Sequence, residues 1–523
     1  FNASVSAGLY GTVTIASSSQ IRIVAGSVTQ NYYGTGFSYN TFGQVTGGIL
    51  QGTDYADSAN GGLQYQITGL NASAVTAYSY VAAGNSQGLT QYLLSGNDVI
   101  DGSGSDDLLT GYTGMDTIDG GAGHDRLDGS GDGAADTLAG GLGDDVYRVD
   151  GGTQPGTQDV LIETAGEGLD TVESLGSFTL PDHFENLLLV GPTQASGTGN
   201  TLANTLTGNA WSNLLDGRAG DDTLDGAGGA DTLHGGTGND LYLVNTPGVA
   251  LVELPGEGVD RVWSTVTLVL PAGVEHLRLL GEDALNATGN ADANLIEGNA
   301  AANVLDGGAG NDTLQGGLGD DTYVVDNPLD VVIDAGGNDS VQVTASGFVL
   351  SGTDIENLAL AGSAISGGGN DAANRITGNA FSNVLDGHGG HDTLDGGAGA
   401  DTLAGGSGDD FYLVGDAGDV AVELPAGGTD TVLATVNHTL AANVEHLMLS
   451  GAHGLRGTGN AVANGITGTA FDDTLDGGAG ADTLTGGAGA NRYEVDNAGD
   501  RVVENGAFGI DWIVSSVHFD LET

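Results

Sequence analysis

GGAGHDRLD at residues 120–128 is nearly repeated as GGAGNDTLQ at 307–315 and as GGAGADTLA at 396–404. The sixth position of each copy is aspartate and the eighth is leucine. Glycines permit the positive φ angles of a tight turn and let backbone carbonyl groups approach a ligand closely. The last three residues alternate as a short strand does, so the nonapeptide predicts a turn and then a strand whose leucine points inward.

The sixth position recurs every nine residues in five arrays, with a two-residue insertion before Asp136. Each array ends on a tyrosine two residues after this position, the first being Tyr147. The later arrays begin with asparagine there, at Asn204, Asn213, Asn294, Asn303, Asn374, Asn383 and Asn464. The aspartates at this position are Asp98, Asp107, Asp116, Asp125, Asp136, Asp145, Asp222, Asp231, Asp240, Asp312, Asp321, Asp392, Asp401, Asp410, Asp473 and Asp482. Repetition this regular predicts a stacked solenoid.

Two nonapeptides complete one turn of such a solenoid, so residues eighteen apart stack, with Asp98 over Asp116. Carboxylates stacked at the strand spacing of about 4.8 Å repel each other unless a cation lies between them. Oxygen ligands without histidine or thiol select a hard ion, and carbonyl-rich turns favour calcium over magnesium. We therefore predict that the aspartates named above bind Ca²⁺. The asparagine turns are expected to bind it more weakly and to form a neutral ladder.

The motif GGxGxDxUx, in which U is a large apolar residue, resembles the RTX (hemolysin-type calcium-binding repeat) family over roughly residues 96–523. The YxVD, DxV, ExLxLxG and TGN segments between the arrays look like those of long secreted or surface RTX proteins of Gram-negative bacteria. The resemblance implies an all-β fold, a parallel β-roll or β-solenoid of nonapeptide arrays with calcium in its turns. It also implies type I secretion to the extracellular space or cell surface.

The spacing divides the chain into an N-terminal segment, five arrays and the connectors that follow them. Residues 1–95 lack the aspartate period and alternate like antiparallel strands, so a separate β-rich segment is expected there. The five RTX arrays are expected at 96–149, 199–244, 289–325, 369–414 and 459–495. β connectors are expected at 150–198, 245–288, 326–368 and 415–458, with a truncated connector at 496–523.

Composition restricts the partners. The chain carries 69 Asp and Glu against 10 Lys and Arg, a formal net charge of -59, which argues against nucleic acid and anionic lipid as partners. Without cations this charge would also oppose a compact fold. Cysteine is absent, and no apolar run approaches the length of a membrane span, so no membrane insertion is predicted. The chain begins at Phe1, from which a processed or partial chain is expected.

Other motifs do not predict chemistry. The pair His388 and His391 falls on tolerant turn positions without a third ligand, so a zinc site is not expected. HExxH and GxSxG are both absent, which argues against a zinc protease or an esterase. A glutamate recurs in each of the four complete connectors, at Glu185, Glu275, Glu356 and Glu445, and this recurrence favours a structural role over glycosidase catalysis. No catalytic residue is predicted.

These observations predict an extracellular, calcium-stabilised structural protein, not an enzyme, that forms part of a filament, surface layer or adhesive matrix. At millimolar calcium, a site with a dissociation constant near 10⁻⁴ M adds about 1.4 kcal/mol, so about ten sites decide folding after secretion. Beside calcium, the expected partners are further copies of the chain, assembling into a filament or lattice through residues 1–95, and an extracellular polysaccharide. The alternative is the calcium-binding region of a larger secreted enzyme or toxin, or of a polysaccharide-modifying protein, with its active domain elsewhere.

Overall fold

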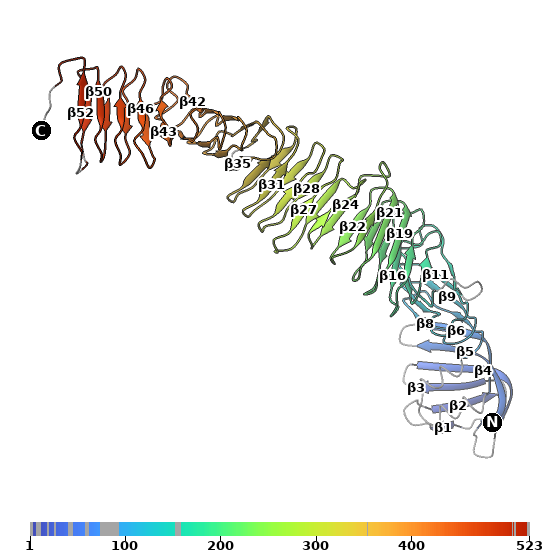
Figure 1. The fold of residues 1–523 in the computed structure, drawn as a ribbon. Coiled ribbons are helices and arrows are strands. Elements are labelled where there is room, and N and C mark those ends of the chain that lie inside the picture. The colour runs from blue at the N-terminus through green and yellow to red at the C-terminus, as the bar shows by residue number, and fades with distance from the viewer. Residues whose placement is uncertain are drawn as a thin grey trace. The chain divides into compact units, whose positions relative to one another are not determined.

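A computed structural model describes strands within residues 4–6, 12–17, 20–25, 28–39, 45–57 and 62–73, and residues 94–519 apart from 152–157, 353, 505 and 507–508. Every regular element in this part of the chain is a β-strand. No helix long and apolar enough to cross a membrane occurs among the described residues. The chain divides into two compact units, Phe1–Val262 and Trp263–Thr523, and strands stack side by side along each of them (Figure 1).

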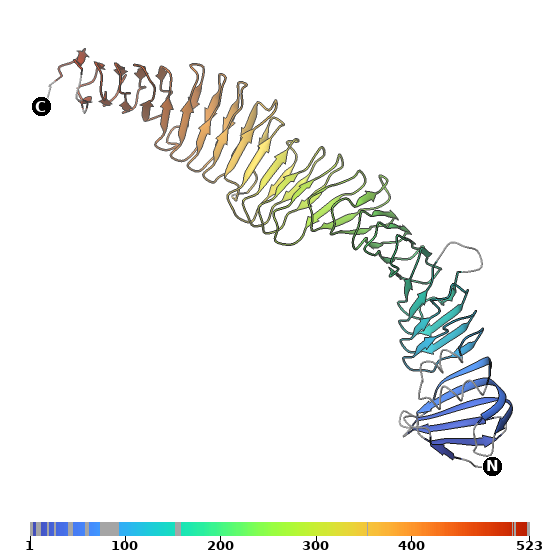
Figure 2. The ribbon, with the colours of Figure 1, turned by 60° about the horizontal axis from the view of Figure 1, so that its bottom comes forward.

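The first unit opens with an antiparallel sheet (Figure 2). Its strands are β1 (Ser4–Ser6), β2 (Thr12–Ser17), β3 (Gln20–Ala25), β4 (Val28–Tyr39), β5 (Val45–Asp57) and β6 (Gly62–Ser73). The sheet continues into the parallel strands β7 (Val99–Asp101), β9 (Thr117–Ala122), β11 (Thr137–Leu142) and β13 (Val160–Ile162). The predicted β-rich N-terminal segment is confirmed. Because β6 pairs antiparallel with β7, this segment covers the edge of the first solenoid strand.

Two further sheets complete the solenoid of the first unit, with parallel pairing throughout. One contains β8 (Leu108–Thr110), β10 (Arg126–Asp128), β12 (Val146–Val149), β14 (Thr171–Ser174), β16 (Asn186–Leu189), β18 (Thr205–Thr207), β20 (Thr223–Asp225) and β22 (Leu241–Val244). The other contains β15 (Phe178–Thr179), β17 (Ser196–Thr198), β19 (Leu214–Ala219), β21 (Thr232–Thr237) and β23 (Ala250–Val252). Strand β24 (Arg261–Ser264) spans the division between the units in the sequence.

The second unit is also a parallel solenoid. Its longest sheet contains β25 (Leu268–Val269), β27 (Asn286–Thr288), β29 (Val304–Asp306), β31 (Thr322–Val325), β33 (Ser340–Val343), β35 (Asn357–Leu360), β37 (Arg375–Thr377), β39 (Thr393–Asp395), β41 (Phe411–Val414), β43 (Thr431–Ala434), β45 (His446–Leu449), β47 (Gly465–Thr467), β49 (Thr483–Thr485) and β51 (Arg501–Val503). The strands facing it fall into three groups. They are β26 (His276–Leu279), β28 (Leu295–Glu297), β30 (Thr313–Gln315) and β32 (Val331–Ile333); β34 (Phe348–Val349), β36 (Ser366–Gly368), β38 (Val384–Asp386), β40 (Thr402–Ala404) and β42 (Val420–Val422); and β44 (His438–Thr439), β46 (Arg456–Thr458), β48 (Thr474–Asp476), β50 (Arg492–Val495) and β52 (Trp512–Ser515).

Strand pairing follows the nonapeptide period. Leu206 in β18 lies beside Leu224 in β20, eighteen residues later. In the first array the insertion lengthens one turn, so that Ile118 pairs with Leu138. The leucines at the eighth position, such as Leu127, are fully buried and stack above one another along the core. The predicted parallel β-solenoid with inward leucines is confirmed.

The connectors continue the same core with turns of other lengths. Tyr147 in β12 lies beside Val172 in β14, and Val172 lies beside Leu187 in β16. The ring of Tyr147 also meets Phe184 edge-on, with ring centroids 5.1 Å apart. The E-x-L stretches are therefore core strands, as their alternation of apolar and polar residues predicts.

Candidate metal centres

In the repeats with aspartate at the sixth position, its carboxylate lies at the end of the turn, just before the short strand begins. Oδ1 of Asp116 accepts a hydrogen bond from the backbone N–H of Asp98 at 2.8 Å, and Oδ1 of Asp125 accepts one from Asp107 at 2.7 Å. Each of these carboxylates ties its own turn to the turn one level earlier, so the predicted stacking of aspartates is confirmed. Asp107 is half-buried, and the other predicted aspartates are all buried.

The second carboxylate oxygen, Oδ2, sets most of these residues apart. It is buried and has no hydrogen-bond partner in Asp98, Asp125, Asp145, Asp222, Asp231, Asp240, Asp312, Asp321, Asp392, Asp401, Asp410 and Asp482. A buried acceptor without a partner costs about 1–3 kcal/mol, and more when it is charged. Four predicted residues, Asp107, Asp116, Asp136 and Asp473, are not in this group. In two of them, Oδ2 of Asp107 and of Asp473 accept N–H bonds from Ser103 and Thr469 at 2.6 and 2.5 Å. The remaining oxygens call for a positively charged partner.

Glycine leaves the room that these oxygens need. A Cβ on Gly120 would overlap Oδ2 of Asp125. A Cβ on Gly121, where φ is +100°, would overlap the carbonyl oxygen of Ser103 in the stacked turn. The turns therefore bring carboxylate and carbonyl oxygens close together. This donor set fits calcium.

Burial changes the acid–base behaviour of the carboxylates. Desolvation, followed by the charge of Asp116, raises the pKa of Asp98 to about 7. Desolvation raises the pKa of Asp222 to about 7 as well, although its hydrogen bond from the backbone of Asn204 opposes the rise. The pKa of Asp125 rises to about 6, again mainly through desolvation. Since a divalent cation favours the charged form, calcium and protons compete for the same oxygens.

The asparagine turns are satisfied without an ion. Nδ2 of Asn204 donates to the carbonyl oxygen of Phe184 at 2.9 Å, while its Oδ1 accepts from the N–H of Asn200 at 2.7 Å. Equivalent Nδ2 bonds to backbone carbonyl oxygens are made by Asn213, Asn294, Asn303, Asn374, Asn383 and Asn464. The asparagine side chains are neutral as expected, but they do not stack on one another, because the N–H of Asn204 donates to Oδ1 of Asp222 at 2.6 Å and the other asparagines do likewise. At these seven positions, hydrogen bonds to protein groups hold the asparagine amide in place.

The sequence interpretation missed acids that continue the ladders beyond the arrays. Oδ1 of Asp330 accepts the N–H of Asp312 at 2.9 Å, so the third array includes a carboxylate pair. Asp330 lies nine residues after Asp321, so the period continues past the tyrosine that the sequence interpretation took as the end of the array. The acids of this kind are Asp159, Asp170, Asp260, Asp330, Asp339, Asp419, Asp430, Asp500 and Asp511. A usable signal was the G-x-D ending of several connector turns, as in GEGLD at 166–170.

The remaining candidates have structural partners. Nδ1 of His391 accepts the N–H of Asp409 at 2.7 Å, and His388 and His391 both lie on exposed turns. Oε2 of Glu185 accepts the N–H of Asp170 at 2.9 Å, and Glu356 and Glu445 hold the equivalent positions. These glutamates extend the ladder of backbone hydrogen bonds, which agrees with the structural role inferred from their recurrence.

Comparison with known protein families identifies the family of the repeat. The family described as the RTX calcium-binding nonapeptide repeat matches residues 94–127, 110–147, 198–233, 207–242, 288–323, 368–403, 377–412, 390–420 and 458–497. The five arrays are RTX calcium-binding nonapeptide repeats. RTX repeats of this kind bind Ca²⁺, so the calcium prediction is confirmed. No curated protein matches the chain.

Proposed function

We propose that the chain is an extracellular structural protein of a Gram-negative bacterium, and that it forms part of a filament, surface layer or adhesive matrix. The observation that carries this proposal is the series of buried Oδ2 atoms without hydrogen-bond partners in the RTX arrays. They make the fold depend on calcium, which extracellular modules bind at roughly 10⁻⁴ to 10⁻³ M. The described part of the solenoid consists of stacked strands and turns, an architecture that presents long, regular surfaces to neighbours.

In this proposal the calcium ligands within the arrays are the aspartates named from the sequence, together with backbone carbonyl groups of the turns. The orphaned Oδ2 atoms support the assignment for most of them. Asp107 and Asp473 are the weakest members of the set, because hydrogen bonds already engage their Oδ2 atoms. In the same proposal the first array begins at residue 96 and the first connector at residue 150, and the later arrays and connectors have the boundaries inferred from the spacing.

Electrostatics support folding after secretion. The chain has a formal net charge of -59. Few arginines offset it in the described residues, one being Arg126, whose guanidinium lies 2.6 Å from Glu173. Before calcium binds, mutual repulsion and buried unpaired carboxylates both favour an extended chain that can pass through a secretion channel. Calcium outside the cell then neutralises the turns and stabilises the solenoid.

Electron microscopy and light scattering of the intact chain test the proposal. Filaments or lattices are expected at millimolar calcium, and dispersed chains in EGTA. Magnesium at equal ionic strength is the control, because it screens charge without fitting the turns. A chain that stays monomeric at high concentration in calcium would favour the alternative, a calcium-binding region of a larger secreted enzyme, toxin or polysaccharide-modifying protein.

The N-terminal segment needs its own control. Removing residues 1–95 is expected to stop assembly, but it would also uncover the edge of β7, with which β6 pairs. The truncated chain therefore tests assembly only if its circular dichroism still depends on calcium as that of the intact chain does. Sedimentation of both chains at matched calcium then compares their assembly directly.

A further inference from the structure

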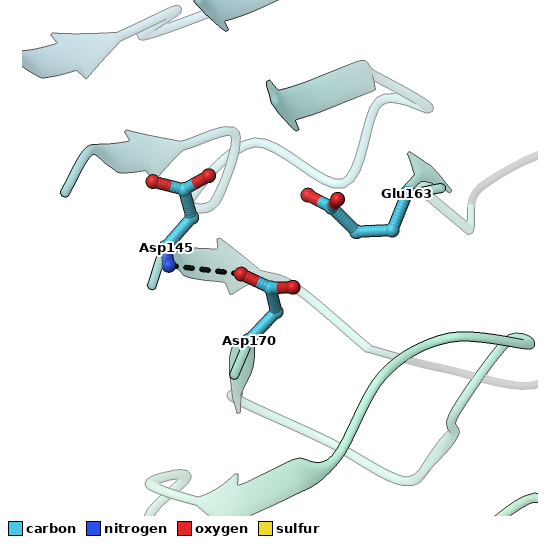
Figure 3. A group of neighbouring side chains, drawn as sticks. All are labelled: Asp145, Glu163 and Asp170. Carbon is cyan, nitrogen blue, oxygen red and sulfur yellow. Dashed lines mark hydrogen bonds between the residues drawn. The ribbon is translucent and has the colours of Figure 1, made fainter. Parts of the chain in front are cut away.

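A third carboxylate joins the last aspartate pair of each of the first four arrays. In the first array, Asp145 and Asp170 are paired through the N–H of Asp145, which donates to Oδ1 of Asp170 at 2.9 Å. Glu163 reaches this pair from the connector, with its carboxylate directed toward both (Figure 3). One oxygen of each of the three residues lies within 4.8 Å of the others. The equivalent trios are Asp240, Glu253 and Asp260; Asp321, Asp334 and Asp339; and Asp410, Glu423 and Asp430.

Unsatisfied buried oxygens point to a ligand at these trios. Asp145 is 1% exposed, and its Oδ2 has no hydrogen-bond partner. Oε2 of Glu163 is also buried without a partner. In the fourth array the same holds for Oδ2 of Asp410 and of Asp430. Three carboxylates placed this closely repel one another, so a cation is the partner that their geometry fits.

A tyrosine holds the third carboxylate in place. The hydroxyl group of Tyr147 donates to Oε1 of Glu163 and accepts the backbone N–H of Gly140 at 2.5 Å. Since a phenol has one proton to donate, it engages one glutamate oxygen and leaves the other for a second partner. Tyr412 holds Glu423 in the same way. This explains why the last repeat of each array has tyrosine where the earlier ones have leucine or isoleucine.

We propose that each of the first four arrays ends in a separate calcium site, in which three carboxylates hold one ion more tightly than the two-carboxylate turns do. Calcium affinity in oxygen sites rises with the number of charged ligands. A turn pair neutralises a divalent ion, whereas a trio leaves one negative charge in excess. The array-end sites therefore fill first as calcium rises and empty last as it falls.

The fifth array provides a natural comparison. Asn491 stands where the other arrays have the last aspartate, and its buried Nδ2 has no hydrogen-bond partner. Its N–H still donates to Oδ1 of Asp511 at 2.9 Å, and Tyr493 still donates to Glu504. This array thus retains the frame of the site and lacks one charge. It should not contribute to the tight class of sites.

Counting bound calcium in the intact chain tests the proposal. Equilibrium dialysis at limiting free calcium is expected to give four tightly held ions per chain. Asn491→Asp restores the missing carboxylate and is expected to add a fifth. This is a gain that misfolding could not produce. An unchanged count in this variant, or a wild-type chain without a separate tight class, would overturn the proposal.

Loss variants provide the complementary measurement. Glu163→Gln removes one charge and keeps the size of the side chain, so the ion at this site should bind at least about tenfold more weakly. Terbium luminescence excited through Tyr147 should fall in the same variant, since the tyrosine contacts this carboxylate. Glu504→Gln in the fifth array is the matched control and should change neither readout. Equal losses in both variants would show that the glutamates act only on the fold.

Discussion

Stripping calcium at neutral pH is expected to unfold the RTX arrays, and acidifying the calcium-free chain is expected to restore part of the β-structure. The reason lies in the buried carboxylates. Burial raises the pKa of Asp98, Asp136, Asp222 and Asp392 from 3.8 to about 7 in the fold. The unfolded chain keeps the lower value, so the calcium-free fold takes up protons between these two pH values.

The size of the effect follows from linkage. At 1.36 kcal/mol per pH unit, each of these groups costs the calcium-free fold about 4 kcal/mol at pH 7. The four groups together cost about 16 kcal/mol, which exceeds the total stability of an ordinary domain, about 5–15 kcal/mol. Because a raised pKa favours folding at low pH, the cost falls to about 2 kcal/mol per group near pH 5 and continues to fall toward pH 3.8.

Far-ultraviolet circular dichroism of stripped, desalted protein across this pH range measures the effect. The β-signal should grow as pH falls from about 7.5 to 5, with calcium-loaded protein as the control, in which the signal should stay constant until protons displace the ion. A β-signal that is unchanged by chelation at neutral pH would refute the reasoning. So would a signal that weakens on acidification of the calcium-free chain.

Three further outcomes are expected. At limiting calcium, mass spectrometry of peptides protected by bound calcium should show a higher calcium occupancy in residues 98–145 than in 294–321. The reason is that Asn294 and Asn303 occupy the first turns of the second segment; equal occupancy would contradict this. Asn374→Ala should cost about 1–3 kcal/mol in thermal unfolding of the calcium-loaded chain, because its Nδ2 bonds the carbonyl oxygen of Ile355 at 2.9 Å. Gly121→Ala should lower both the melting temperature and calcium affinity, since its Cβ meets Ser103; an unchanged midpoint would argue against the close turn contact.

Much of the fold could be predicted from the fixed spacing between the acidic and the apolar position of each repeat. Because leucine follows the acidic position by two residues in most repeats, the residues alone predict which side of each strand faces the core. The eighteen-residue register followed from two repeats per turn, and the pairing of Leu206 with Leu224 obeys it. Stacked aspartates then implied calcium, because like charges at strand spacing need a cation.

The rest depended on contacts that spacing does not encode. Glu163 lies eighteen residues after Asp145, but it belongs to a connector whose turn lengths differ from those of the arrays. Its approach to Asp170 could therefore not be predicted from residue spacing. The role of Asn204 depends on the carbonyl oxygen of Phe184. Phe184 belongs to a connector, whose length does not follow the nine-residue period. The pairing of β6 with β7 joins two segments without a shared repeat.

The contrast between aspartate and asparagine turns also has a mechanical consequence. In the stack, each level of the first array adds about 4.8 Å along the solenoid. Released under tension, the segment from Asp98 to Asp145 would extend to roughly 160 Å. The turn at Asn204 is closed by hydrogen bonds that do not require an ion. Under tension the solenoid would therefore lengthen first where its carboxylates lose calcium, and the calcium concentration would set the load at which each array yields.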